Sequence, residues 1–196
     1  GDASAKITAL NLSDGSMVSG FPRQVRSIPT SRISFGYFGN PGRLALFWGS
    51  EDGKINGAWS DSGDSIPGFP VSTGYSVSAA PTLADFDGSG TLSICAASQD
   101  FKIHLFGESG AVQRGFPVET GIRLKDAPAI AQFGSAPGSK TRGLFCVVAA
   151  GDGKIHVLSK DGSERRGFPV NVGQKIAGNA IAADLDGDGT DEILAA

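Results

Sequence analysis

Lys154-Ile155, followed after a turn by Gly167-Phe168-Pro169, supplies two short motifs that recur along the chain. The tripeptide occurs four times, at Gly20-Phe21-Pro22, Gly68-Phe69-Pro70, Gly115-Phe116-Pro117 and Gly167-Phe168-Pro169. The dipeptide keeps the same rhythm, at Lys6-Ile7, Lys54-Ile55, Lys102-Ile103 and Lys154-Ile155. Two motifs in step predict an internal repeat of about 48 residues, with a Ser/Pro/Gly insertion at 135–140 lengthening the third interval.

Each repeat contains four apolar runs of four to six residues, which Gly and Asp turns separate. In the last part of the chain these runs lie at 154–158, 167–170, 179–183 and 192–195. Alternation and β-branched residues favour strands, and no segment keeps a helical period. Four short antiparallel strands in a unit of this length are typical of a β-propeller blade. We therefore predict an all-β fold, one β-propeller domain over 1–196 with repeats at about 1–50, 51–98, 99–150 and 151–196.

The phase of the repeats predicts how the ring is built. Proline cannot donate to a strand ladder, so the Gly-Phe-Pro-Val segment is expected to be the outermost strand, with its Phe packed between blades. With the strands lettered A (inner) to D (outer), the chain opens on C and D and stops after A and B. Joining the two ends would complete a fourth blade and remove exposed sheet edges. We expect a closed four-bladed propeller; the alternatives are half of an eight-bladed ring made by two chains, or a fragment of a larger propeller.

Aspartates at alternate positions form an acidic loop between the last two strands, Asp184-Leu185-Asp186-Gly187-Asp188-Gly189-Thr190-Asp191-Glu192. Calcium takes six to eight oxygen ligands, and side chains at positions 1, 3 and 5 of such a loop converge on one centre. The loop predicts a calcium site whose ligands are Asp184, Asp186, Asp188, the Thr190 carbonyl and Glu192. An EF-hand is excluded because its twelfth position would be Ala195 instead of Glu. The competing interpretation is an acidic turn without an ion.

A weaker copy of this loop lies about one hundred residues earlier, and the two other repeats lack it. Its expected ligands are Asp85, Asp87, Ser89 and the Thr91 carbonyl, with Ser93 a poor ligand at the ninth position. The equivalent segments 36–42 and 132–138 carry no aspartate, and we expect no ion there. Ion-bearing loops are therefore predicted to alternate along the repeats, with the last loop binding more tightly because it has more carboxylates.

The run from Ala183 to Gly189 with Glu192-Ile193, its copy at Asp85 and the Gly-Phe-Pro motif resemble the FG-GAP/VCBS repeat family of β-propellers, which also includes integrin α-subunit heads. The resemblance spans the chain, but only two of the four repeats keep the ion motif, and four repeats are fewer than the seven of integrin-like rings. It implies calcium in these loops, a protein or glycan partner and an extracellular, periplasmic or cell-surface location. No signal peptide is visible at Gly1-Asp2, and the missing initial Met indicates a processed or excised chain.

Charge, cysteines and aromatic residues narrow the remaining functions. The net charge is −3 with scattered basic residues, which argues against nucleic acid, and no apolar run is long enough to insert in a membrane. Cys95 and Cys146 lie in apolar runs and are expected to be buried free thiols, with a disulfide as the alternative. Trp48 and Trp59 are expected to pack, with sugar stacking as the alternative.

No catalytic site is visible in the sequence. His104 and His156 occupy the same place in two repeats, which predicts a structural role at a surface or blade interface. No nucleophile–base set, phosphate loop or zinc motif is present. We expect a non-enzymatic calcium-binding module for protein or glycan binding or adhesion, monomeric or homodimeric. The alternative is the propeller domain of a secreted polysaccharide-active or quinoprotein-type enzyme.

Overall fold

The computed structural model describes residues 5–39, 41–133 and 143–196, and every regular element in them is a β-strand. The predicted insertion at 135–140 lies outside the described residues. Three four-stranded antiparallel sheets form complete blades. Blade 1 is β3 (Ser34–Phe38), β4 (Arg43–Gly49), β5 (Lys54–Trp59) and β6 (Val71–Ser72). Blade 2 is β7 (Thr82–Ala84), β8 (Ser93–Ala97), β9 (Lys102–Phe106) and β10 (Val118–Glu119). Blade 3 is β11 (Ala129–Phe133), β12 (Gly143–Ala149), β13 (Lys154–Leu158) and β14 (Val170–Asn171).

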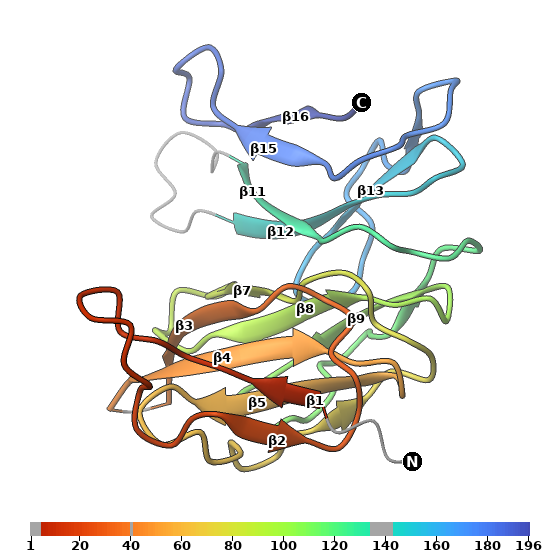
Figure 1. The fold of residues 1–196 in the computed structure, drawn as a ribbon. Helices are drawn as coiled ribbons and strands as arrows, with labels where there is room; N and C mark the ends of the chain where they lie inside the picture. Colours follow the sequence, from red (N-terminus) through yellow and green to blue (C-terminus); the bar gives the residue numbers. More distant parts are fainter. Residues whose placement is uncertain (1–4, 40, 134–142) are drawn as a thin grey trace.

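Two further pairs of strands lie at the ends of this stack (Figure 1). The N-terminal half-blade is β1 (Ala5–Ile7) and β2 (Arg23–Val25), and the C-terminal half-blade is β15 (Ile181–Ala183) and β16 (Glu192–Leu194). By their place in the repeat they are strands C and D, and strands A and B. The all-β propeller architecture and its four-stranded blades are as predicted from the sequence.

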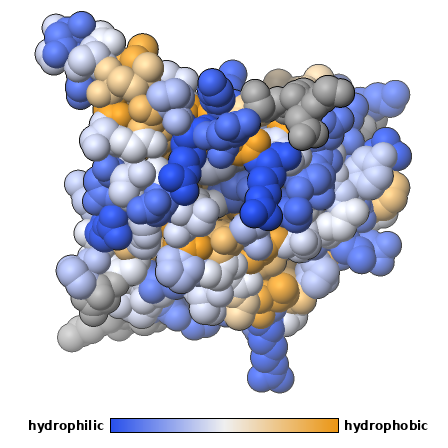
Figure 2. Space-filling model, turned by 60° about the horizontal axis from the view of Figure 1, so that its bottom comes forward, coloured by the Kyte–Doolittle hydropathy of each residue, from blue (hydrophilic) through white to orange (hydrophobic). Residues whose placement is uncertain are grey.

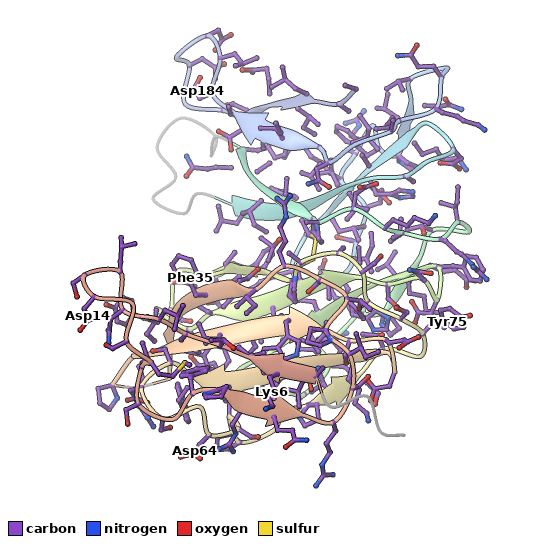
Figure 3. The ribbon with its side chains drawn as sticks, viewed as in Figure 1. Lys6, Asp14, Phe35, Asp64, Tyr75 and Asp184 are labelled. Carbon is purple, nitrogen blue, oxygen red and sulfur yellow. A yellow bond between two sulfur atoms is a disulfide. The ribbon has the colours of Figure 1, made fainter. Side chains whose placement is uncertain are left out.

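The two half-blades do not meet, and this differs from the predicted ring. They form separate two-stranded sheets, and Figure 1 shows them at the bottom and the top of the stack. Lys6, on β1, and Asp184, at the end of β15, mark the two ends in Figure 3. The expected fourth blade, made from both ends of one chain, is therefore not assembled in this structure. The chain forms an open fan of blades, as the alternatives of a half ring or a fragment require.

Apolar side chains of each blade alternate between its two neighbours. On β4, Ala45 and Phe47 belong to the core between blades 1 and 2, whereas Trp48 belongs to the core between blade 1 and the N-terminal half-blade. Such alternation follows from the two-residue period of a strand, which turns successive side chains to opposite faces. Four apolar clusters result, each shared by two neighbouring sheets. The core thus lies between the blades, and the face seen in Figure 2 is mostly hydrophilic with separate hydrophobic areas.

The Gly-Phe-Pro motif positions the outer strand of each blade without belonging to it. Each Phe packs into one of the four clusters, as predicted. The outer strands begin just after the Pro, at Arg23, Val71, Val118 and Val170, so the assignment of the motif itself to the strand was wrong. All four Phe–Pro peptide bonds are cis.

The glycine of the motif meets the turn between strands C and D of the following blade. Gly68 has a φ of +86°, and a methyl group built on it would overlap the carbonyl oxygen of Ser109. The contact is reciprocal: a methyl group built on Gly110, in that turn, would overlap the carbonyl oxygen of Gly68. The same reciprocal contact joins Gly115 and Gly162. Only a residue without a side chain permits both the left-handed backbone and this close approach.

A disulfide connects blades 2 and 3, which corrects the prediction of two free thiols. Cys95 on β8 and Cys146 on β12 are bonded, and their Cα atoms lie 7.0 Å apart. Both side chains are buried in the cluster between these blades. The sequence showed that each cysteine lies in an apolar run. It could not show that β8 and β12 of neighbouring blades place the two side chains face to face.

Candidate metal centre

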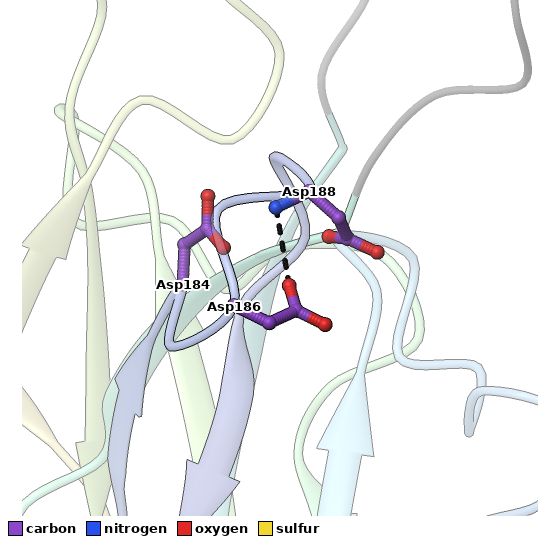
Figure 4. A group of neighbouring side chains, drawn as sticks. All are labelled: Asp184, Asp186 and Asp188. Atoms are coloured by element: carbon purple, nitrogen blue, oxygen red, sulfur yellow. Dashed lines mark hydrogen bonds between the residues drawn. The ribbon is translucent and has the colours of Figure 1, made fainter.

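The last acidic loop connects β15 to β16 at the C-terminal half-blade. Gly187 and Gly189 have φ values of +80° and +86°, which close the turn and bring alternate side chains to one side. The carboxylates of Asp184, Asp186 and Asp188 converge there, each offering one oxygen within 4.8 Å of the others (Figure 4). A calcium ion with ligands at about 2.4 Å spans about 5 Å between opposite ligands, so the spacing fits one ion.

Backbone amides hold these carboxylates in place. Asp184 accepts hydrogen bonds from the amides of Gly187 at 2.7 Å and Gly189 at 2.9 Å. Asp186 accepts from the amide of Asp188 at 3.1 Å, and Asp188 accepts from the amide of Thr190 at 2.7 Å. An ionised carboxylate has about four lone-pair positions, so each retains capacity for a cation. The loop is therefore organised by its own backbone, with its acidic groups exposed to solvent.

The other predicted ligands of this loop have different surroundings. Glu192, the first residue of β16, reaches back across the loop and accepts the amide of Leu185 at 2.8 Å. Asp191, which the sequence analysis did not single out, joins the loop to blade 3. Its carboxylate accepts the amide of Gln132 at 2.6 Å, and its amide donates to the Gln132 carbonyl at 2.8 Å. The equivalent residue in the loop of blade 2 is Leu92, which packs against blade 1. An apolar residue at that position was the sequence signal that this position contacts the neighbouring blade.

The earlier loop has a similar backbone arrangement but a weaker set of ligands. Asp85 accepts the amides of Ser89 at 3.1 Å and Gly90 at 2.7 Å, and Ser89 accepts the amide of Thr91 through its hydroxyl at 3.2 Å. The hydroxyl and amide of Ser89 hold the pKa of Asp87 below its usual value. Ser93 begins β8, paired with Ala84. Two of the predicted ligands of this loop, Asp85 and Asp87, are carboxylates, whereas the last loop brings three carboxylates together.

A lysine from the next blade lies beside the earlier loop. Lys160 Nζ is 3.6 Å from a carboxylate oxygen of Asp87. Both groups line an open groove of about 580 Å³ between blades 2 and 3, together with Arg114 and Asp161. The positive charge of Lys160 reduces the electrostatic attraction of this loop for a calcium ion. Of the segments expected to hold no ion, 36–42 and 132–138, residue 40 and residues 134–138 lie outside the described residues.

The histidines and tryptophans have packing roles. His104 is 4% exposed, contacts Asp100 through Nε2 at 2.9 Å and stacks on Phe106. Burial lowers the pKa of His104 in spite of the opposing Asp100 carboxylate. His156 is buried at the equivalent place and contacts Glu164 at 3.1 Å. Trp48 is buried, which removes it as a sugar platform.

The second tryptophan is partly buried and packs beneath a guanidinium group. The Cζ of Arg43 lies 4.4 Å from the centre of the Trp59 ring. Trp59 also packs against the core between blades 1 and 2.

In the described part of the chain, no helix is both long and apolar enough to cross a membrane.

Comparison with known proteins gives the fold and no family. No family model and no curated protein matches the chain. Among solved structures, the computationally designed protein Ika4 is similar, with a TM-score of 0.58 and 16% identity over 92% of this chain and 98% of Ika4. The designed protein Ika8 gives a TM-score of 0.56 and 16% identity over the whole chain. BBS1N, in its complex with ARL6DN, gives a TM-score of 0.56 and 13% identity over 89% of the chain.

These neighbours are β-propellers, and their low identity supports the fold alone. The chain spans about half the length of two of them, 53% of Ika8 and 47% of BBS1N. The protein is therefore a β-propeller module.

Proposed function

We propose that the chain is a non-enzymatic propeller module that binds calcium at the loop 184–192 and a protein or glycan partner elsewhere on its surface. The convergence of three carboxylates within 4.8 Å carries this proposal. Without a cation these groups repel one another, whereas a divalent ion turns the repulsion into attraction. The loop's likeness to FG-GAP repeats supports the same assignment.

Calcium in this loop would stabilise the C-terminal half-blade at the end of the fan. The C-terminal half-blade has two strands, and its loop touches blade 3 through Asp191 and Gln132. An ion bound by Asp184, Asp186 and Asp188 would hold the connection between β15 and β16.

The proposed partner is supported by a structural neighbour, and the proposed location is supported by the disulfide. BBS1N, a structural neighbour, is found in a complex with the protein ARL6DN. A propeller offers its loops and blade edges for such contacts, and we infer a protein or glycan partner for this chain as well. The Cys95–Cys146 disulfide supports an oxidising location, extracellular, periplasmic or at the cell surface.

Thermal unfolding with and without calcium tests the ion site. At a calcium concentration one hundred times the Kd, binding adds about 2.7 kcal/mol of stability. For a chain of this size that is a rise in Tm of about 5–11 °C. Asp186→Asn should abolish the rise and leave the calcium-free protein as stable as before or more so, since one repelling charge is gone.

Asp14→Asn is the matched control, because Asp14 is an exposed loop aspartate bonded only within its own turn. It should keep the full calcium response. A wild-type Tm that calcium leaves unchanged would remove the metal from the proposal. A protein and polysaccharide array with an activity readout then separates binding from turnover, and measurable turnover would overturn the non-enzymatic assignment.

A further inference from the structure

Equivalent apolar positions are buried in the complete blades and exposed in the N-terminal half-blade. Ala58, Phe106 and Leu158 close the same turn between strands C and D and are 5%, 1% and 0% exposed. Leu10 makes the same bridge, to Met17, and is 57% exposed. In the complete blades this position faces the preceding blade. Leu10 is exposed because the described residues place no blade on that side of the N-terminal half-blade.

The C-terminal half-blade shows the complementary exposure on its other face. Ala182 and Ile193 pack toward blade 3, so their neighbours Ile181 and Leu194 face away from it. These two side chains are 61% and 45% exposed. Cys95, which occupies the position of Leu194 in blade 2, is fully buried against blade 3. A following blade is what this face lacks.

The inner part of blade 1 is the surface that would cover that face. Phe35 pairs with Leu46 across β3 and β4, on the side turned away from blade 2. Phe35 and Tyr37 are each 72% exposed, although they lie on the innermost strand. Leu83, at the position of Phe35 in blade 2, packs against the neighbouring blade. The N-terminal half-blade covers only the outer part of blade 1, because it contains strands C and D alone.

The glycine contacts between blades give the same result independently. Gly20, Gly68 and Gly115 each meet the turn of the following blade. Gly167 has the same backbone, with a φ of +94°, and no described atom lies within 4 Å of a methyl group built on it. Gly15, in the corresponding turn of the N-terminal half-blade, also has nothing within 4 Å. Gly167 of the motif and Gly15 of the turn therefore both lack the neighbour that their equivalents have. Each is the type of residue that the other would contact.

We propose that a second copy of this chain docks on these surfaces, so that each N-terminal half-blade completes the C-terminal half-blade of the other copy. Every chain carries one pair of A and B strands and one pair of C and D strands, which is the self-complementary set that a two-fold dimer needs. Three blades from each copy and two shared blades give a closed ring of eight. The unpaired edges of β1 and β16 then disappear, which removes an aggregation hazard.

The register of the shared blade follows from the complete ones. In blade 2, Ala97 pairs with Ile103 and Cys95 with Leu105. In blade 3, Ala149 pairs with Ile155. Transferred to the two copies, Ala196 of one chain pairs with Ile7 of the other, and Leu194 pairs with Ala9.

The neighbouring blade gives one further contact. Leu194 occupies the position of Cys95, and Leu46, opposite Ala58, occupies the position of Cys146, opposite Leu158. Leu194 of one copy therefore faces Leu46 of the other, as the two native cysteines face each other.

Cross-linking of two single variants tests the contact between copies. Leu46→Cys and Leu194→Cys are placed in separate chains, mixed and oxidised, so that a bond between them can form only between molecules. In an equal mixture that exchanges subunits freely, about half of the dimers contain one copy of each variant, so we expect about half of the protein at about 40 kDa on non-reducing electrophoresis, twice the 20.0 kDa of one chain. Leu194→Cys mixed with Val112→Cys is the control, because Val112 is exposed on blade 2 away from both ends. This mixture should stay at 20.0 kDa.

Light scattering of the chain without added cysteines tests the assembly independently. We expect twice the monomer mass, complete loss of the dimer in Leu10→Glu, and retention of the dimer in Val112→Glu. A monomer at every concentration, without the cross-link, overturns the proposal. So does a cross-link that forms within one chain carrying both cysteines while its mass stays at 20.0 kDa, which would show closure of the chain on itself. Masses above the dimer would show open-ended association and also overturn it.

Discussion

Replacing one motif glycine by alanine should destabilise the protein by an amount that depends on its place in the fan. Gly68→Ala puts a methyl group on a residue with a φ of +86° and pushes it into the carbonyl of Ser109. The left-handed backbone costs a residue with a side chain about 1–2 kcal/mol. Overlap with a rigid backbone atom adds about 1–3 kcal/mol. We expect Gly68→Ala to lower the free energy of unfolding by about 2–5 kcal/mol.

Gly167→Ala is the matched variant, because the motif is identical and the φ, +94°, is similar. No described atom lies within 4 Å of the added methyl, so only the backbone cost of about 1–2 kcal/mol remains. Urea unfolding measures both losses. It should be done at protein concentrations where light scattering shows monomers, since Gly167 would acquire a neighbour in a ring of two copies.

The two outcomes are separated clearly enough to refute the reasoning. Equal losses in the monomer would mean that the contact with the following turn contributes nothing and that the backbone conformation accounts for the whole effect. A loss at Gly167 that grows with protein concentration would instead show that its partner turn belongs to another molecule. Gly68→Ala should show no such dependence, because its partner, Ser109, lies in the same chain.

Two other measurements test the core. Reduction of Cys95–Cys146, which spans 51 residues of sequence, should lower the free energy of unfolding by about 4 kcal/mol in the chain-entropy treatment, and urea midpoints that reductant leaves unchanged would contradict this. Burial lowers the pKa of His104, so the unfolded chain binds a proton at this site more readily than the folded chain. The free energy of unfolding should therefore be at its full value above pH 6.5 and fall as the pH drops through the lowered pKa of the folded state. His104→Gln should flatten that part of the curve of urea midpoint against pH, and an equally steep curve would assign the loss to other groups.

The sequence could predict the blade because each repeat states its strands several times. Lys154-Ile155 and its three copies all begin strand C or lie in it, and the apolar runs before them pair as expected. The convergence of the carboxylates in the last loop follows from the sequence by the same means, since residue type and spacing fix which side chains can meet; the ion itself stays a prediction. Asp184, Asp186 and Asp188 are neighbours along the chain, so no knowledge of the rest of the fold was needed.

Contacts between repeats were harder to predict because they join residues that are far apart in sequence. Cys95 and Cys146 have similar apolar surroundings in sequence, and only the packing of β8 against β12 brings their sulfur atoms together. Asp191 could be taken for another calcium ligand, yet its carboxylate is bonded to Gln132 of blade 3. Lys160 likewise reaches Asp87 from a different repeat. Each case depends on how one blade is placed on the next.

The number of blades depends on that same placement, which explains why the closed ring of four was a plausible and incorrect expectation for one chain. Repeats of this kind bury their apolar faces only against their neighbours, so any number that closes the ring satisfies every repeat equally. The contacts near the inner strands of neighbouring blades differ along the chain. A methyl on Gly36 would lie 3.1 Å from the side chain of Leu92, whereas Asp191, in the position of Leu92, replaces this apolar contact by hydrogen bonds to Gln132. The repeated sequence therefore specifies each blade but not the angles between neighbouring blades. In this structure those angles leave the two half-blades apart.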